Sequence, residues 1–156
     1  MALDLRGYGK SHGPGDSDPM DAAIHLDVLA AVHYLRKNGA ISVSIVGASM
    51  GGWAAGDACI ESEHGEIDRV VFLGSAPNQS ADKLKCPSLY IVARDDASED
   101  GPRLPGIRAQ YEKSPEPKKL IILEGSAHAQ FLFQTDQAGR VMPEIIAFLS
   151  AKTGNR

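Results

Sequence analysis

Five short, continuously apolar runs divide the chain, and helix-like patterns fill the segments between them. The apolar runs are residues 2–5, 43–46, 70–73, 89–93 and 120–123. Because the apolar residues are continuous rather than alternating, we expect strands that are buried on both faces, with helical layers above and below. The pattern therefore predicts an α/β fold, a three-layer, doubly wound and mostly parallel sheet of about five strands.

Four helices are predicted to supply those layers. The clearest is bracketed by Asp18 as N-cap, Pro19 at the first helical position and Gly39 just past its end. The others are expected over residues 50–62, 103–112 and 141–149. No repeat or low-complexity linker is visible, so residues 1–156 are interpreted as one domain, and residues 76–88 are too few for a lid domain.

Composition and charge narrow the classes of function. The 156 residues carry a formal net charge of -4 and no long basic cluster, so no nucleic-acid partner is expected. No export signal and no membrane-spanning apolar run is visible, which favours a cytoplasmic protein without a membrane partner. Cys59 and Cys86 lack metal-ligand spacing and are interpreted as small buried thiols, and we expect neither a metal nor a cofactor.

The strongest chemical signal is the segment Gly47-Ala48-Ser49-Met50-Gly51, which follows a predicted strand and opens a predicted helix. In that context G-x-S-x-G forms a sharp turn that leaves the serine hydroxyl exposed above the sheet. Ser49 is therefore the candidate nucleophile, and the Met50 N–H at the helix start is a candidate donor to an oxyanion. The alternative is that Ser49 is only the small residue of a tight turn.

Two later loops offer the base and the acid that a serine nucleophile needs. His128 lies a few residues after the last predicted strand, and Asp95 and Asp96 follow the strand at residues 89–93. The carboxyl ends of parallel strands share one edge of a sheet, so these loops can converge on Ser49. Spacing alone leaves either aspartate open as the acid, and either also fits as a cap of the following turn.

Two more segments accompany the turn at Ser49, which we call the elbow. They are Asp4-Leu5-Arg6-Gly7-Tyr8-Gly9-Lys10-Ser11 and Gly125-Ser126-Ala127-His128. The first resembles the D-x-R-G-x-G-x-S loop of α/β-hydrolase-fold proteins, and the second resembles the histidine loop of that family. Residues 86–96 resemble the strand and loop that hold the family's acid. The resemblance covers the C-terminal two-thirds of the family fold, and it implies Asp96 as the acid and hydrolysis of esters or related acyl compounds.

The chain departs from this family at its start. Family members carry three further strands and a helix before the first residue given, including the loop that supplies a second oxyanion N–H. A backbone N–H from residues 7–13 is the candidate replacement. Without the third family strand, residues 2–5 are expected to pair with residues 43–46 or with another copy, and the thinly covered sheet edge and face favour a homo-oligomer.

The sequence thus predicts a carboxylesterase-like serine hydrolase for a small-molecule acyl substrate. Ser49 attacks, His128 moves the proton, Asp96 orients His128, and the Met50 N–H stabilises the oxyanion. One alternative is a catalytically weak or silent remnant of the fold that binds a ligand or a protein. Another is that the working protein is longer than this chain.

Overall fold

Four parallel strands form the main sheet of the computed structural model, which describes residues 1–15, 17–18 and 23–151. In the order of the sheet they are β1 (Ser44–Ala48), β2 (Arg69–Leu73), β3 (Ser88–Ala93) and β6 (Lys118–Leu123). A separate antiparallel pair, β4 (Ala97–Ser98) and β5 (Gly101–Pro102), forms a small hairpin after β3. The hairpin was not predicted, because two-residue strands leave no periodic pattern in a sequence.

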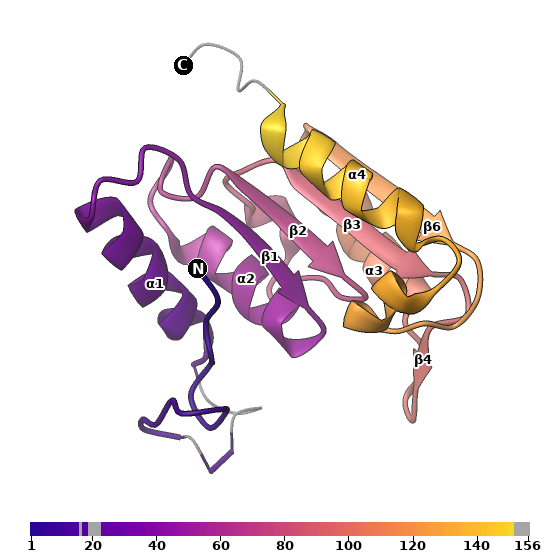
Figure 1. Ribbon diagram of the computed structural model, residues 1–156, viewed down its shortest axis with the longest axis horizontal. Helices are drawn as coiled ribbons and strands as arrows, with labels where there is room; N and C mark the ends of the chain where they lie inside the picture. The colour runs from indigo at the N-terminus through magenta and orange to yellow at the C-terminus, as the bar shows by residue number, and fades with distance from the viewer. Residues whose placement is uncertain (16, 19–22, 152–156) are drawn as a thin grey trace.

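Helices cover both faces of the sheet, as predicted for a doubly wound fold (Figure 1). The α-helices are α1 (His25–Lys37), α2 (Met50–Glu61), α3 (Leu104–Lys113) and α4 (Ala138–Ser150), and the 3-10 helices are η1 (Ala81–Lys83) and η2 (Ala129–Gln134). One core packs the first three helices against residues such as Phe72 and Tyr90, and the other packs α4 and η2 against Val71 and Leu89. Neighbouring residues of one strand therefore enter opposite cores, which gives three layers.

The predicted first helix begins later than expected. Within the described residues α1 starts at His25, whereas part of the predicted start, from Pro19 onward, lies outside them. Gly39 follows the helix with φ 89°, the left-handed conformation that commonly ends a helix and that glycine adopts without strain. The predicted C-terminal end is therefore confirmed.

The predicted strand over residues 2–5 is wrong, and so is its direct pairing with residues 43–46. A groove of about 480 Å³ lies between the first residues of the chain and the free edge of β1. A strand needs a neighbour about 4.8 Å away to pair its N–H and C=O groups, and residues 2–5 form no such pairing with β1. The main sheet consequently has four strands instead of about five. Pairing of this edge with a second copy stays a prediction.

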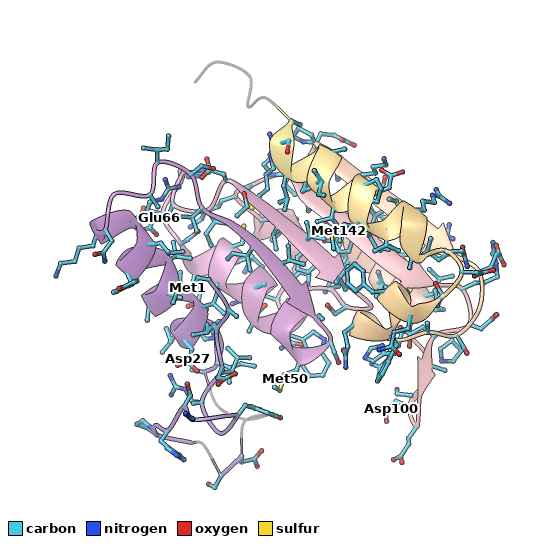
Figure 2. All side chains as sticks on the ribbon, viewed as in Figure 1. Met1, Asp27, Met50, Glu66, Asp100 and Met142 are labelled. Atoms are coloured by element: carbon cyan, nitrogen blue, oxygen red, sulfur yellow. The ribbon has the colours of Figure 1, made fainter. Side chains whose placement is uncertain are left out.

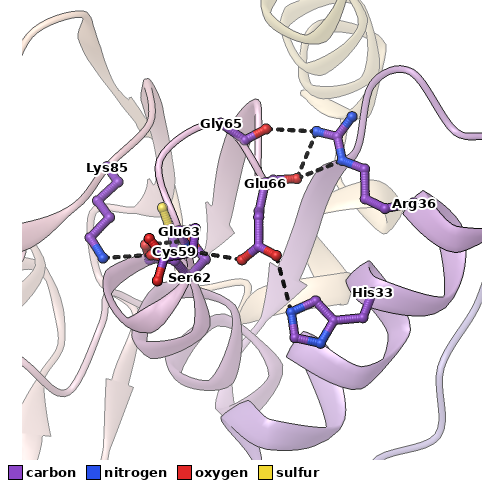
Figure 3. Close-up of polar contacts among 8 residues, drawn as sticks. All are labelled: His33, Arg36, Cys59, Ser62, Glu63, Gly65, Glu66 and Lys85. Carbon is purple, nitrogen blue, oxygen red and sulfur yellow. Dashed lines mark hydrogen bonds and ion pairs between the residues drawn. The ribbon is translucent and has the colours of Figure 1, made fainter.

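Arg36 of α1 fixes the connection between α2 and β2 (Figure 3). Its guanidinium donates to the carbonyl oxygens of Gly65 at 2.9 Å and Glu66 at 2.7 Å, and it pairs with the Asp68 carboxylate at 2.7 Å. Asp68 also accepts a hydrogen bond from the Val43 N–H at 2.8 Å, just before β1. These bonds set where β1 and β2 begin, at the end of the sheet opposite to the predicted catalytic loops.

Candidate active site

Ser49 forms the sharp turn between β1 and α2 and has φ 51° and ψ -124°. This conformation is strained for a residue with a side chain and is typical of functional turns. The Ser49 N–H donates to the Leu73 carbonyl oxygen of β2 at 3.0 Å, and the Ser49 carbonyl oxygen accepts from the Gly52 N–H at 2.9 Å. The turn is therefore anchored to the neighbouring strand and to the first turn of the helix, as the elbow motif predicts.

The structure brings together the three side chains that the sequence selected from separate loops. Ser49 Oγ lies 2.9 Å from His128 Nε2, and His128 Nδ1 lies 2.8 Å from Asp96 Oδ2. A carboxylate can only accept, so Nδ1 carries the imidazole proton and donates it to Asp96, which leaves Nε2 free to accept from the Ser49 hydroxyl. The relay runs from the hydroxyl of half-buried Ser49 through an imidazole that is 28% exposed to a carboxylate that is 0% exposed.

Burial and contacts separate the two adjacent aspartates. Asp95 is exposed, whereas Asp96 points into the protein toward His128. On its other oxygen, Asp96 Oδ1 lies 3.3 Å from the Nε atom of Arg103, the residue just before α3. Arg103 could not be selected from the sequence, because its contact with Asp96 depends on how the hairpin β4–β5 folds back. The only signal in the sequence is that an arginine directly follows Gly101-Pro102.

Gly74, at the end of β2, supports the same group of side chains. A Cβ atom at this position would lie 3.0 Å from His128 Nδ1 and 3.0 Å from Asp96 Oδ2. Its φ of 61° also favours glycine. The loop after β2 therefore approaches the His128–Asp96 pair as closely as a backbone can, which the sequence analysis also missed.

Met50 begins α2, where the first N–H groups of a helix have no acceptor within the helix. Figure 2 shows Met50 along the same edge of the sheet as the hairpin residue Asp100. The loop proposed to supply a second donor comes close, because the Tyr8 hydroxyl lies 3.8 Å from Met50 Sδ. Three backbone N–H groups of that loop are already used, since Gly7 donates to Ser11, Tyr8 to Leu5, and Ser11 to Tyr8.

A cavity of about 400 Å³ adjoins the site. Its wall includes Trp53 on α2, Gly74 and Ser75 after β2, and Asp100 and Arg103 on the hairpin and its return. Trp53 of α2 therefore lines the space beside the site. The space is open to solvent, and its lining is more polar than that of most small-molecule sites.

Arg6 holds the N-terminal loop in place through hydrogen bonds. Its guanidinium donates to Asp27 Oδ1 at 2.6 Å and to the Pro14 carbonyl oxygen at 2.9 Å, and its backbone N–H donates to Asp27 Oδ2 at 3.0 Å. The hydrogen bonds from Arg6 hold the pKa of the Asp27 carboxyl below its usual range. The loop is thus tied to the first turn of α1.

The remaining candidate groups lie away from the serine. Cys59 and Cys86 are buried free thiols, as predicted, with their Sγ atoms 2.7 Å apart. Among residues 1–15, 17–18 and 23–151, no group of three or more His, Cys, Asp or Glu side chains is placed to hold a metal ion. In the same ranges, no helix has both the length and the apolar character needed to cross a membrane.

Comparisons with known proteins agree with this architecture. The sequence profile of the alpha/beta hydrolase family matches residues 19–146. A comparison with curated protein sequences finds no significant match.

Several solved structures are similar in fold. A dienelactone hydrolase from Anabaena variabilis is 24% identical with a TM-score of 0.60, and the match covers 81% of this chain and 57% of that one. A predicted CIB-like hydrolase from Thermoplasma acidophilum is 20% identical with a TM-score of 0.70, covering 94% of this chain and 70% of that one. An esterase from a Rhodococcus species is 16% identical with a TM-score of 0.71, covering 95% and 78%. At these identities the likeness shows the fold.

Proposed function

The chain belongs to the alpha/beta hydrolase family, and from that premise we propose that it is a serine hydrolase that cleaves a carboxylic ester or a related acyl compound. One observation carries the proposal, namely the unbroken relay from Ser49 Oγ to His128 Nε2 at 2.9 Å and from His128 Nδ1 to Asp96 Oδ2 at 2.8 Å. These contacts join loops that lie 79 and 32 residues apart in the sequence. They also follow the chain order Ser, Asp, His that is typical of this fold.

In the proposed mechanism His128 Nε2 takes the proton from the Ser49 hydroxyl as Oγ attacks the acyl carbon. The carbonyl oxygen becomes an oxyanion, which the Met50 N–H at the positive end of α2 stabilises. His128 then gives the proton to the leaving alcohol, which leaves an acyl group on Ser49. His128 next takes a proton from a water molecule, whose oxygen attacks the acyl carbon. The carboxylic acid leaves as His128 returns the proton to Ser49 Oγ, and Asp96 stabilises the imidazolium in both the acylation and the deacylation step.

The surroundings of Ser49 favour small acyl substrates. The adjoining cavity of about 400 Å³ has room for a short acyl or alkoxy group, and its polar residues suit a substrate that can form hydrogen bonds. The similar structures include esterases and dienelactone hydrolases, whose names describe hydrolysis of esters and lactones. The proposed substrate class is therefore a small carboxylic ester.

Turnover of p-nitrophenyl acetate by the wild type and by Ser49→Ala tests the proposal. We expect the substitution to remove nearly all activity above the uncatalysed rate, since the alanine cannot form the acyl-enzyme. A fluorophosphonate probe should label the wild type at Ser49 and leave Ser49→Ala unlabelled. Heat-unfolded wild type is the matched control, because labelling there would report ordinary serine reactivity.

Two results would contradict the proposed function. Equal turnover by the wild type and Ser49→Ala would place the reaction at another residue. A folded wild type that neither turns over the ester nor reacts with the probe would favour the silent binding module, the alternative raised by the single oxyanion donor identified at Met50.

A further inference from the structure

The hairpin β4–β5 brings the residue that follows it back beside the residue that precedes it. Asp96 immediately precedes β4, and Arg103 immediately follows β5. At the base of the hairpin the Arg103 N–H donates to the Asp96 carbonyl oxygen at 2.8 Å. The side chains approach as well, with Arg103 Nε 3.3 Å from Asp96 Oδ1. The same two residues are therefore joined through their backbones and through their side chains.

Neither of these side-chain atoms has another partner within the described residues. Asp96 Oδ1 and Arg103 Nε are both buried, and neither makes a hydrogen bond, so the two atoms meet as an ion pair at 3.3 Å. Burying a carboxylate without a partner is strongly unfavourable, whereas pairing with a cation and hydrogen-bond donors compensates for the lost hydration. His128 engages only Oδ2. Arg103 is thus the cation that faces the other oxygen.

The other charged groups of this loop do not serve the same purpose. Asp95 is exposed, and Arg94 pairs with the exposed side chain of Glu124 at 2.9 Å. Asp100 is an exposed residue of the hairpin turn. Within the described chain, Arg103 is consequently the charged side chain that can fix the plane of the Asp96 carboxylate.

We infer that Arg103 is a positioning residue for the hydrolytic reaction, holding the Asp96 carboxylate so that Oδ2 faces His128 Nδ1. This inference rests on the proposed function. Without the guanidinium, Oδ1 loses its partner and the carboxylate is free to rotate toward water. His128 then loses its fixed orientation, which affects the chemical step more than the binding of substrate.

Chemical rescue tests this role. In Arg103→Ala we expect kcat for p-nitrophenyl acetate to fall about 10- to 100-fold, less than the roughly ten-thousandfold loss that follows when the acid itself is disabled. KM should change much less than kcat, because Arg103 is one of many residues that line the cavity and its Nε atom faces Asp96. Guanidinium chloride at about 20 mM should restore part of kcat by filling the vacated space, whereas sodium chloride at equal ionic strength should not.

Arg94→Ala is the matched control, since it removes a neighbouring arginine that pairs only at the surface. It should keep the wild-type kcat with or without guanidinium. If Arg103→Ala does not fold, Arg103→Lys and Arg103→Met replace it. We then expect the lysine variant, which keeps the positive charge, to retain at least fivefold more kcat than the methionine variant, which keeps the bulk.

Several outcomes would overturn the inference. For Arg103→Ala these are an unchanged kcat, a rise in KM alone, or a lower kcat in the folded variant that guanidinium does not raise. For the second pair, the overturning result is an equal kcat for Arg103→Lys and Arg103→Met. Each of them leaves Ser49-dependent turnover by the wild type intact. Failure of the proposed function would instead appear as a wild type without such turnover.

Discussion

Gly47 is the residue at which the elbow is most sensitive to substitution. A Cβ atom there would lie 2.4 Å from the Gly51 carbonyl oxygen and 2.7 Å from Gly52 Cα. Such contacts are ordinarily longer than 3.0 Å, so the first turn of α2 must move by at least about half an ångström. Overpacking costs about 1–3 kcal/mol, and backbone atoms cannot rotate away as side chains can. We expect Gly47→Ala to lower the free energy of unfolding by about 3 kcal/mol.

The same displacement carries Ser49, which directly follows Ala48 in the turn. A shift of about 1 Å in a reacting group can reduce turnover on the order of a hundredfold. For a domain of this size, about 3 kcal/mol corresponds to roughly 10 °C in Tm. Urea unfolding and p-nitrophenyl acetate turnover on the same samples measure both effects, with activity read well below the Tm of the variant.

Gly51 provides the matched control, because it is the other glycine of the motif and a Cβ there would meet nothing within 4 Å. It lies inside α2, where alanine is favoured over glycine by about 1 kcal/mol. Gly51→Ala should therefore keep or raise the free energy of unfolding. Wild-type stability and turnover in Gly47→Ala, or equal damage from both substitutions, would refute the contact-based reasoning.

Three further predictions concern the site and the pH dependence of stability. Asp96→Asn should lower kcat on the order of a thousandfold or more, because it favours the wrong histidine tautomer. Asp95 is exposed, so Asp95→Asn should change kcat less than about twofold. Similar losses of ester turnover in the two variants would contradict the choice of Asp96. Burial raises the pKa of Tyr90 to about 12, against about 10 in an unfolded chain, so its contribution to stability is complete below pH 10 and is lost as the pH rises toward 12. Urea unfolding should show a decline of about 2–3 kcal/mol over that range in the wild type and a smaller one in Tyr90→Phe. The hydrogen bonds from Arg6 hold the pKa of Asp27 low, so the pair stabilises the fold above about pH 4 and stops doing so as the pH falls through the lowered pKa. In acid unfolding, Asp27→Asn should lack the loss of stability that protonation of Asp27 causes in the wild type.

Local patterns in the sequence identified the parts of the fold that depend on neighbouring residues. The elbow could be predicted because a positive φ at Ser49 and the close approach at Gly47 impose small residues at fixed spacing. Continuous apolar runs identified β2 and β3 because both strands are buried on both faces. The run at residues 2–5 is interrupted by Asp4, and a strand also requires a paired edge, which depends on what lies beside it in space.

The contact that Arg103 makes with the candidate acid Asp96 could not be predicted for a related reason. Adjacent Asp95 and Asp96 have the same chemistry in the sequence, and they differ only in the direction that the backbone gives each side chain. A hairpin of two strands brings Arg103 beside Asp96, and each strand has only two residues, too few to produce a periodic signal in the sequence. Resemblance to family motifs selected Asp96, whereas the contact with Arg103 became visible only with the coordinates.

The small hairpin after β3 also bears on how this protein can acquire new specificity. Its base is closed by the contacts between Asp96 and Arg103, and its exposed turn at residues 99–100 borders the adjoining cavity through Asp100. Surface turns of this kind tolerate changes in length and composition. Insertions there can reshape the wall that a substrate meets while the buried carboxylate keeps its place, so the turn is a natural starting point for directed evolution.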